Sequence, residues 1–195
     1  MIEMLGVLAI IGVLSVGGIA GYTKAMMKYK INKATDQISQ VVAGTRTLYG
    51  SQGSYGDSIS NHEDFAPILK KAHVIPDEMV GTDDAVTNPW DGGFDVSSAG
   101  KKAADDNKAF TITLTGLPEQ ACMELATYDW GSGSSSGLIS LSVGVGVSDG
   151  LLFGCSSDII STDYVNICAA NMPMSVSTAA SVCSGDDSKL SLKFF

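Results

Sequence analysis

The start of the sequence has almost no charge. Glu3 is followed by eighteen residues, 4 to 21, without an acidic or basic side chain. No basic residue precedes this apolar run, and a secretory signal peptide would have a basic start and a small-residue cleavage site. The run is long enough for a membrane helix. We therefore expect a hydrophobic anchor helix rather than an ordinary signal peptide.

Metal-binding residues are also scarce. There are two histidines, His62 and His73, and the four cysteines form no CxxC pair. Structural zinc sites have closely paired ligands, so zinc is disfavoured. The acids of residues 77–91 lack the regular spacing of a calcium loop. We expect these acids and both histidines to lie in solvent, and we expect no metal or other cofactor. The acids are Asp77, Glu78, Asp83, Asp84 and Asp91.

Catalytic and nucleic-acid signatures are weak. The stretch "GSSSG" (133–137) formally matches a nucleophile motif around Ser135. That motif needs a strand before it and a helix after it, whereas this Gly/Ser run reads as a loop. No triad, redox motif or phosphate loop is evident, so we expect no enzyme. The net charge of −9 argues against a general nucleic-acid binder, which needs clustered basic residues.

Proline is absent from the first 49 residues. Beyond the apolar run, an apolar stripe recurs at three- and four-residue steps, which is typical of an amphipathic helix. One continuous helix would be about 70 Å long, so its first half must project and be covered by lipid or by other copies of itself. The stripe comprises Ile31, Ala34, Ile38, Val41, Val42, Thr45, Leu48 and Tyr49.

Five glycines lie inside the apolar half, at positions 6, 12, 17, 18 and 21. They allow two interpretations. The segment is a membrane helix of ordinary glycine content, or it packs closely against identical neighbours and can loosen around Gly12 or Gly17–Gly18. We expect residues 1–22 to form the anchor, 23–50 the amphipathic continuation and 51–195 a globular head.

The cysteines indicate an oxidising compartment. An even number behind a hydrophobic segment suggests two disulfides, with three possible connectivities. Lysines follow the apolar run, and the positive-inside rule alone would leave the head in the cytoplasm. The conflict disappears if a short basic leader once preceded Met1 and has been removed. These lysines are Lys24, Lys28, Lys30 and Lys33, and the cysteines are Cys122, Cys155, Cys168 and Cys183.

The remaining sequence predicts an α+β fold with an antiparallel sheet laid against the second half of the long helix. Alternating patterns predict strands in 109–115, 138–147 and 189–195, with 151–153 as a possible hairpin partner. Helices are predicted in "LPEQACMELATY" and in residues 173–183. A short amphipathic helix is predicted through Phe65, Ile68 and Leu69, with Pro67 near its first turn. Residues 50–93 otherwise read as a long connection.

The segment "MIEMLGVLAIIGVLSVGG" closely resembles the start of type IV pilins after processing by a prepilin peptidase and N-methylation. Glu3 matches the glutamate that is the fifth mature residue in that family, so the count is short by two. On this resemblance the sequence would lack the first two mature residues, or its start was trimmed differently. "KAFTITLTGLPEQACMELA" (108–126) and "SVCSGDDSKLSLKFF" (181–195) resemble the type IVb class, which includes toxin-coregulated pilin and conjugative thin-pilus pilins. "TNPWDGGFDV" (87–96) resembles a turn found among the latter.

The resemblance implies a structural subunit whose long helix is first a membrane anchor and then the core of a homopolymeric filament. The inner membrane, its assembly machinery and the prepilin peptidase are the implied partners before assembly. The cell surface is the implied final location. The resemblance also implies a disulfide between Cys122 and Cys183, which leaves Cys155 to pair with Cys168. Glu3 would pair with the α-amino group of a neighbouring subunit and set its axial register. Alternatively, Glu3 lies in water at the lipid headgroups.

Other functions remain open from sequence alone. A minor pilin or a secretion-system pseudopilin would share the long helix. A membrane-anchored periplasmic enzyme or receptor domain would share only the anchor. Adhesion, self-aggregation and conjugation are all compatible with the leading interpretation, a major pilin.

Overall fold

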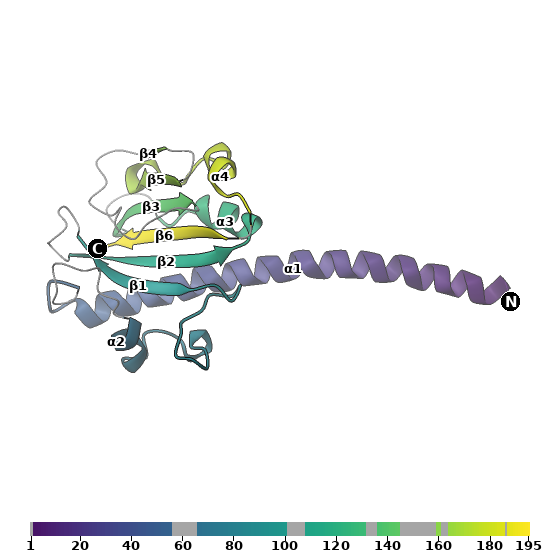
Figure 1. Cartoon of the computed structure of the whole chain (residues 1–195), viewed down its shortest axis with the longest axis horizontal. Coiled ribbons are helices and arrows are strands. Elements are labelled where there is room, and N and C mark those ends of the chain that lie inside the picture. Colours follow the sequence, from purple (N-terminus) through teal and green to yellow (C-terminus); the bar gives the residue numbers. More distant parts are fainter. Residues whose placement is uncertain are drawn as a thin grey trace.

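One long helix, α1 (Ile2–Tyr49), runs from the N-terminus into the head (Figure 1). The computed structural model describes residues 2–55, 66–100, 108–131, 136–144, 159–160, 164–185 and 187–195. The N-terminus lies at the far end of the projecting helix and the C-terminus lies in the head. The absence of proline and the two apolar patterns together explain one unbroken helix. The predicted continuous helix with a projecting first half is confirmed.

The second half of α1 is buried along one side. Ile38 and Val41 are fully buried, and Tyr49 at the end of the helix is 7% exposed. The predicted stripe is therefore the face that meets the head. Leu48 is the exception, because 37% of it is exposed. The next residue, Tyr49, is buried instead of Leu48, and its ring packs against that of Tyr55, with ring centroids 5.6 Å apart.

The head contains a six-stranded antiparallel sheet in the order β1-β2-β6-β3-β5-β4. The last strand of the chain therefore lies in the middle of the sheet, between β2 and β3. The strands are β1 (Phe94–Ala99), β2 (Ala109–Leu117), β3 (Leu138–Gly144), β4 (Ile159–Ile160), β5 (Tyr164–Cys168) and β6 (Ser188–Phe194).

The strands predicted in 109–115 and 189–195 are confirmed as β2 and β6. The strand predicted in 138–147 is confirmed as far as Gly144, and its last residues lie outside the described part, as does the segment 151–153. Three strands were not predicted. Phe94–Ala99 forms the edge strand β1, although its first residues read as part of a turn. Ile159–Ile160 forms β4, and Tyr164–Cys168 forms β5.

The two faces of the sheet differ in chemistry. Apolar side chains of β2 and β6 are buried on the face toward α1, including Phe110, Ile112, Leu192 and Phe194. The alternate residues are polar and also buried. Cross-strand hydrogen bonds satisfy some of the buried polar side chains of the sheet. Between β2 and β6, Thr113 Oγ1 lies 2.9 Å from Ser191 Oγ, and between β3 and β5, Ser142 Oγ donates to Asn166 Oδ1 at 2.7 Å.

Three short helices surround the sheet: α2 (Ala66–Lys71), α3 (Glu119–Ala126) and α4 (Val176–Val182). All three were predicted. In α2, Leu69 is fully buried but Ile68 is 52% exposed, so Ile68 does not join the buried face, and Phe65 lies outside the described residues. Short 3-10 turns occur at Asp77–Met79 and Ala169–Asn171. Ser175 caps α4 by accepting a hydrogen bond from the Thr178 amide at 3.2 Å.

A disulfide joins Cys122 in α3 to Cys183 at the end of α4, with Cα atoms 5.7 Å apart. This pairing was implied by the family resemblance and is confirmed. It closes a loop across 61 residues of sequence and holds the segment before β6 to the helix beside the sheet. Cys168 is also disulfide-bonded. Its predicted partner Cys155 lies outside the described residues, so that pairing stays a prediction.

Candidate assembly interface

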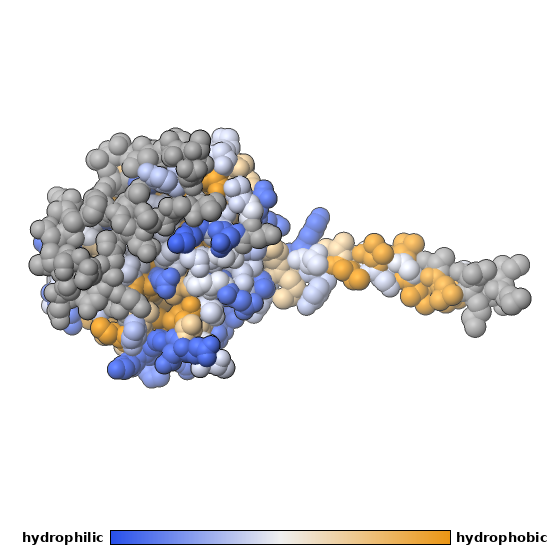
Figure 2. Space-filling model, viewed as in Figure 1, coloured by the Kyte–Doolittle hydropathy of each residue, from blue (hydrophilic) through white to orange (hydrophobic). Residues whose placement is uncertain are grey.

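The projecting half of α1 is an exposed apolar rod (Figure 2). The large apolar side chains described between Val7 and Tyr22 are each more than half exposed, from Ile11 at 53% to Val13 at 75%. Among the described residues, this is the one helix long and apolar enough to cross a membrane, and none of its most apolar window is buried within the chain. Apolar surface in water costs about 25 cal/mol per Å². Lipid or other protein chains must therefore cover this rod.

Glycines in the rod have no packing role inside the chain. A Cβ at Gly6, Gly12, Gly17, Gly18 or Gly21 would meet nothing within 4 Å. Each glycine costs roughly 1 kcal/mol relative to alanine in a helix interior. The helix nevertheless continues through Gly17–Gly18. Their predicted roles in close packing and in local loosening therefore concern contacts outside the single chain, and both stay predictions.

Glu3 lies in the first turn of α1, and its side chain is outside those described. The nearest lysine along the helix is Lys24, about 30 Å away at 1.5 Å per residue. No cation on the same helix can therefore neutralise Glu3. The predicted partner, an α-amino group of a neighbouring subunit, stays a prediction.

Two ion pairs attach α1 to the head just after the exposed rod. Lys28 Nζ lies 2.8 Å from Glu124 Oε2 on α3, and Lys33 Nζ lies 3.2 Å from Glu78 Oε2. Gln37 Nε2 also donates to Glu78 Oε1 at 2.8 Å. The two acids lie on different segments of the head, so α1 is held from both.

These hydrogen bonds favour the ionised carboxylates. The bond from Lys28 lowers the pKa of Glu124. The bond from Gln37, followed by that from Lys33, lowers the pKa of Glu78. The Glu78 side chain is 54% exposed, so its ion pair contributes modestly to stability. Its main effect is to fix the loop beside α1.

The predicted residues are therefore distributed over two parts of the molecule. Cys122 and Cys183 staple the head, whereas Glu3 and the glycines lie on the projecting rod. The prediction that Glu78 is only a solvated acid was incomplete, because Glu78 holds the loop to α1. His73 is 82% exposed and Asp77 is 93% exposed, as expected.

Sequence reasoning missed Glu124 and Glu78 as anchoring residues. The available signal was the group of lysines after the apolar run, because cations on an otherwise buried helix need acidic neighbours. His62 and Ser135 lie outside the described residues. The segment after Ser135 leads into the strand β3, whereas a nucleophile elbow leads into a helix.

Comparison with known proteins identifies this architecture. The family described as PilS N terminal matches residues 28–193. The chain belongs to this family of type IVb pilins. As a member of a pilin family it is a structural protein rather than an enzyme.

Relatives of known function match the whole pilin. It is 26% identical over 196 aligned residues to the major structural subunit of bundle-forming pilus from Escherichia coli O127:H6 (strain E2348/69 / EPEC). The alignment covers 100% of this chain and 91% of the relative. The corresponding protein of Escherichia coli O111:H- matches with the same identity and coverage.

Solved structures share the fold. TcpA, a type IV pilin from Vibrio cholerae El Tor biotype, superposes with a TM-score of 0.62 and 19% identity, over 86% of this chain and 99% of the other. The type IVb pilin from Salmonella typhi gives a TM-score of 0.56 and 17% identity, over 83% and 97%. The predicted type IVb class is confirmed.

Proposed function

We propose that this pilin is the major structural subunit of a type IV pilus and polymerises through α1 into an extracellular filament. The exposed apolar rod carries this proposal, because the head buries none of it. The full-length similarity to major subunits of bundle-forming pilus supports it. A filament whose core is a bundle of these rods would remove them from water, with the heads on the outside.

The same rod suits the stage before assembly. We infer that the pilin is processed by a prepilin peptidase and waits in the inner membrane with α1 in lipid, and that the membrane assembly machinery then adds it to the filament. The apolar surface is then buried throughout, first by lipid and then by other subunits. Transfer between the two environments is possible because both are apolar.

Glu3 would provide the register in the filament core. An ionised carboxylate in hydrocarbon costs at least a few kcal/mol, and α1 offers it no cation. The α-amino group of a neighbouring subunit would neutralise Glu3 at one axial offset only. A subunit added at another offset would keep a buried, unpaired charge.

Gly12, Gly17 and Gly18 would let neighbouring rods approach closely. Replacing Gly17 by leucine should leave the unfolding of the head unchanged, because a Cβ there meets nothing in the chain. The same change should reduce the yield of filaments. An Ile19→Leu change at a neighbouring exposed position is the control. A normal filament yield from Gly17→Leu would contradict the proposed role of this glycine in close packing.

The function is tested by shearing surface material from cells that produce the protein and examining it by electron microscopy. We expect filaments in which this pilin is the dominant band. A trace amount within filaments of another protein would indicate a minor pilin. A dispersed monomer in the membrane, without any filament, would refute polymerisation. Sequencing the N-terminal residue of sheared filaments would also locate the mature start relative to Glu3.

A further inference from the structure

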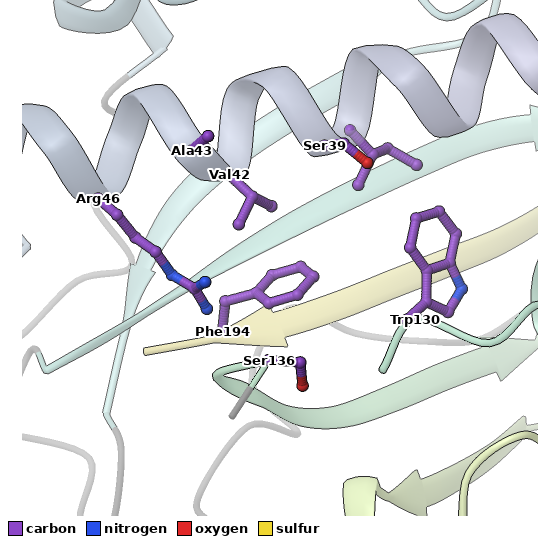
Figure 3. A pocket seen from close by; sticks show the side chains of 8 residues that line it. Ser39, Val42, Ala43, Arg46, Trp130, Ser136 and Phe194 are labelled. Carbon is purple, nitrogen blue, oxygen red and sulfur yellow. The ribbon is translucent and has the colours of Figure 1, made fainter. Parts of the chain in front are cut away.

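A pocket of about 250 Å³ lies between the second half of α1 and the sheet (Figure 3). Arg46 and Trp130 lie toward its two ends, with the ring of Phe194 between them. Trp130 and Ser136 belong to the connection between α3 and β3. We call this hollow the arginine pocket, defined by Ser39, Val42, Arg46, Trp130, Ser136 and Phe194.

The fold holds Arg46 in place at this pocket. Its Cζ lies 5.5 Å from the centroid of the Phe194 ring, within the range of a cation–π contact. Gly137 lies directly beside the guanidinium, and any Cβ at that position would collide with Nη2 of Arg46. Gly137 has a φ of 69°, which favours glycine. The glycine therefore both forms the turn and leaves room for the arginine.

Two of the three guanidinium nitrogens of Arg46 have no acceptor among the described residues. Its Nε and Nη2 atoms are buried, and neither has a hydrogen-bond partner among the described residues. Burial lowers the pKa of Arg46, which Tyr55 partly opposes. A buried donor without an acceptor is costly, and the planar fork of arginine suits a carboxylate. The O atom of Phe195 lies beside Gly137 as well, but it accepts no hydrogen bond from these two nitrogens. The pocket is therefore complementary to a further carboxylate from outside the described part of the chain.

An acidic surface lies on the opposite side of α1. We call residues 77–91 the acidic loop, and Glu78 attaches it to Lys33 and Gln37. Gln37 and Arg46 are about two and a half turns apart on the helix, so they point to opposite sides. An exposed stripe of α1 separates the acidic loop from the arginine pocket. It contains Asp36, Gln40 and Thr47.

The acidic loop presents two carboxylates at its tip. Val80 pairs with Val86, and the Gly81 amide donates to the Ala85 carbonyl at 2.8 Å, which forms a tight turn. Asp83 and Asp84 occupy this turn. Asp83 is exposed, and the Asp84 side chain is 89% exposed with a long 3.8 Å contact to Lys70. Both carboxylates can therefore reach a neighbouring molecule.

We propose that a carboxylate at the tip of the acidic loop, from Asp83 or Asp84, enters the arginine pocket of the next copy of this chain. This inference rests on the proposed function, because it needs a filament. The two surfaces are different and lie on opposite sides of α1. Such a contact is head-to-tail, so each copy added leaves one surface of each kind free and the series continues.

A charge swap tests the contact in cells that produce the pilin. Arg46→Glu should lower the pilin recovered in sheared filaments by about tenfold or more, because buried interfacial charge pairs are costly to break. Asp83→Lys with Asp84→Lys should have a similar effect. Combining all three changes should restore much of the yield. Lys71→Glu changes the net charge by the same amount as Arg46→Glu, at an exposed position of α2, and should leave the yield unchanged.

Cross-linking tests the same contact if Arg46→Glu weakens the head itself. Ser39→Cys at the pocket and Asp84→Cys at the loop tip are combined, and intact filaments are oxidised. We expect a ladder of covalent multimers on a non-reducing gel. Each single-cysteine variant should lack the ladder, and so should Asp84→Cys combined with Ser181→Cys on α4.

The outcomes separate this inference from the proposed function. If the unaltered protein forms no filaments, polymerisation itself is refuted. If filaments form but the cysteine pair gives no ladder, or the charge swap restores nothing, something other than a second copy fills the pocket and this inference is overturned. Unchanged filament yield with Arg46→Glu overturns it as well.

Discussion

The two halves of α1 differ in what covers them. Residues 6–8 and 10–25 are exposed, apolar almost throughout and rich in glycine. From Ile31 onward, one side of the same helix is buried and two ion pairs hold it to the head. A helix that is apolar all round needs an apolar environment, whereas an amphipathic helix needs one apolar neighbour. The first half thus needs a covering from outside the chain, whereas the buried side of the second half makes its contacts within the head.

Glu3 gives the largest expected effect and tests the first half of the comparison. Glu3→Ala should abolish filaments, because the proposed register charge is lost, while the head folds and α1 enters the membrane normally. Electron microscopy of sheared material measures the filaments, and membrane fractionation measures insertion. Glu119→Ala on the head, which removes one acid elsewhere, is the control. Normal piliation by Glu3→Ala would rule out the register role.

The Cys122–Cys183 disulfide tests whether the head is stabilised independently of the rod. Replacing both cysteines by alanine should lower the free energy of unfolding of the head by about 4 kcal/mol, because a loop of this length no longer restricts the unfolded chain. The helical signal of α1 in detergent should persist. Circular dichroism in the near and far ultraviolet distinguishes the two. Simultaneous loss of both signals would show that the halves of α1 are not independent.

A matched pair of isoleucines sharpens the comparison with the smallest chemical change. Ile38 is fully buried against the head, and Ile19 is 66% exposed on the rod. Ile38→Val should lower the free energy of unfolding of the head by about 0.5–1.5 kcal/mol, because it leaves a cavity. Ile19→Val should not change it. Thermal unfolding of the full chain in detergent measures both, and equal shifts would contradict the division of α1.

The same division explains how much the sequence could predict. The long helix, β2, β6, α3 and α4 have strong local patterns, so periodicity was sufficient. In β1, only Phe94 and Val96 show an alternating apolar signal before two serines, and glycines precede them. The strand forms because Val96 pairs with Ile112 of β2, a contact that local sequence does not encode. Asn166 similarly interrupts the pattern of β5 and is accommodated by Ser142.

The proposed assembly surfaces divide in the same way. The apolar rod, Glu3 and the glycines were identified from sequence, since their signal is local and the family resemblance strengthens it. The environment of Arg46 could not be foreseen. Its neighbours Phe194 and Gly137 are distant in sequence, and only the sheet topology places them beside α1. Glu78 looked like one acid among five because its partner Gln37 lies on another element.

The ion pair at the boundary between the two halves gives the smallest expected effect. Lys28 lowers the pKa of Glu124 in the folded protein, so the pair stabilises the fold above the ordinary pKa of glutamate. That contribution is lost as pH falls through the lowered pKa. At neutral pH, Glu124→Gln should therefore reduce the free energy of unfolding by at most about 1 kcal/mol, since the pair is partly exposed.

The pH dependence distinguishes this electrostatic effect from a packing effect. The difference between the unaltered protein and Glu124→Gln should shrink toward acid pH and in high salt. Glu119→Gln on the same helix removes an acid that has no ion pair among the described residues, so it should change stability less at every pH. A Glu124→Gln difference that stays constant down to acid pH would mean that the end of the rod is fixed by packing. The Lys28–Glu124 ion pair would then lie at the boundary between the two halves of α1 without stabilising the attachment of the helix to the head.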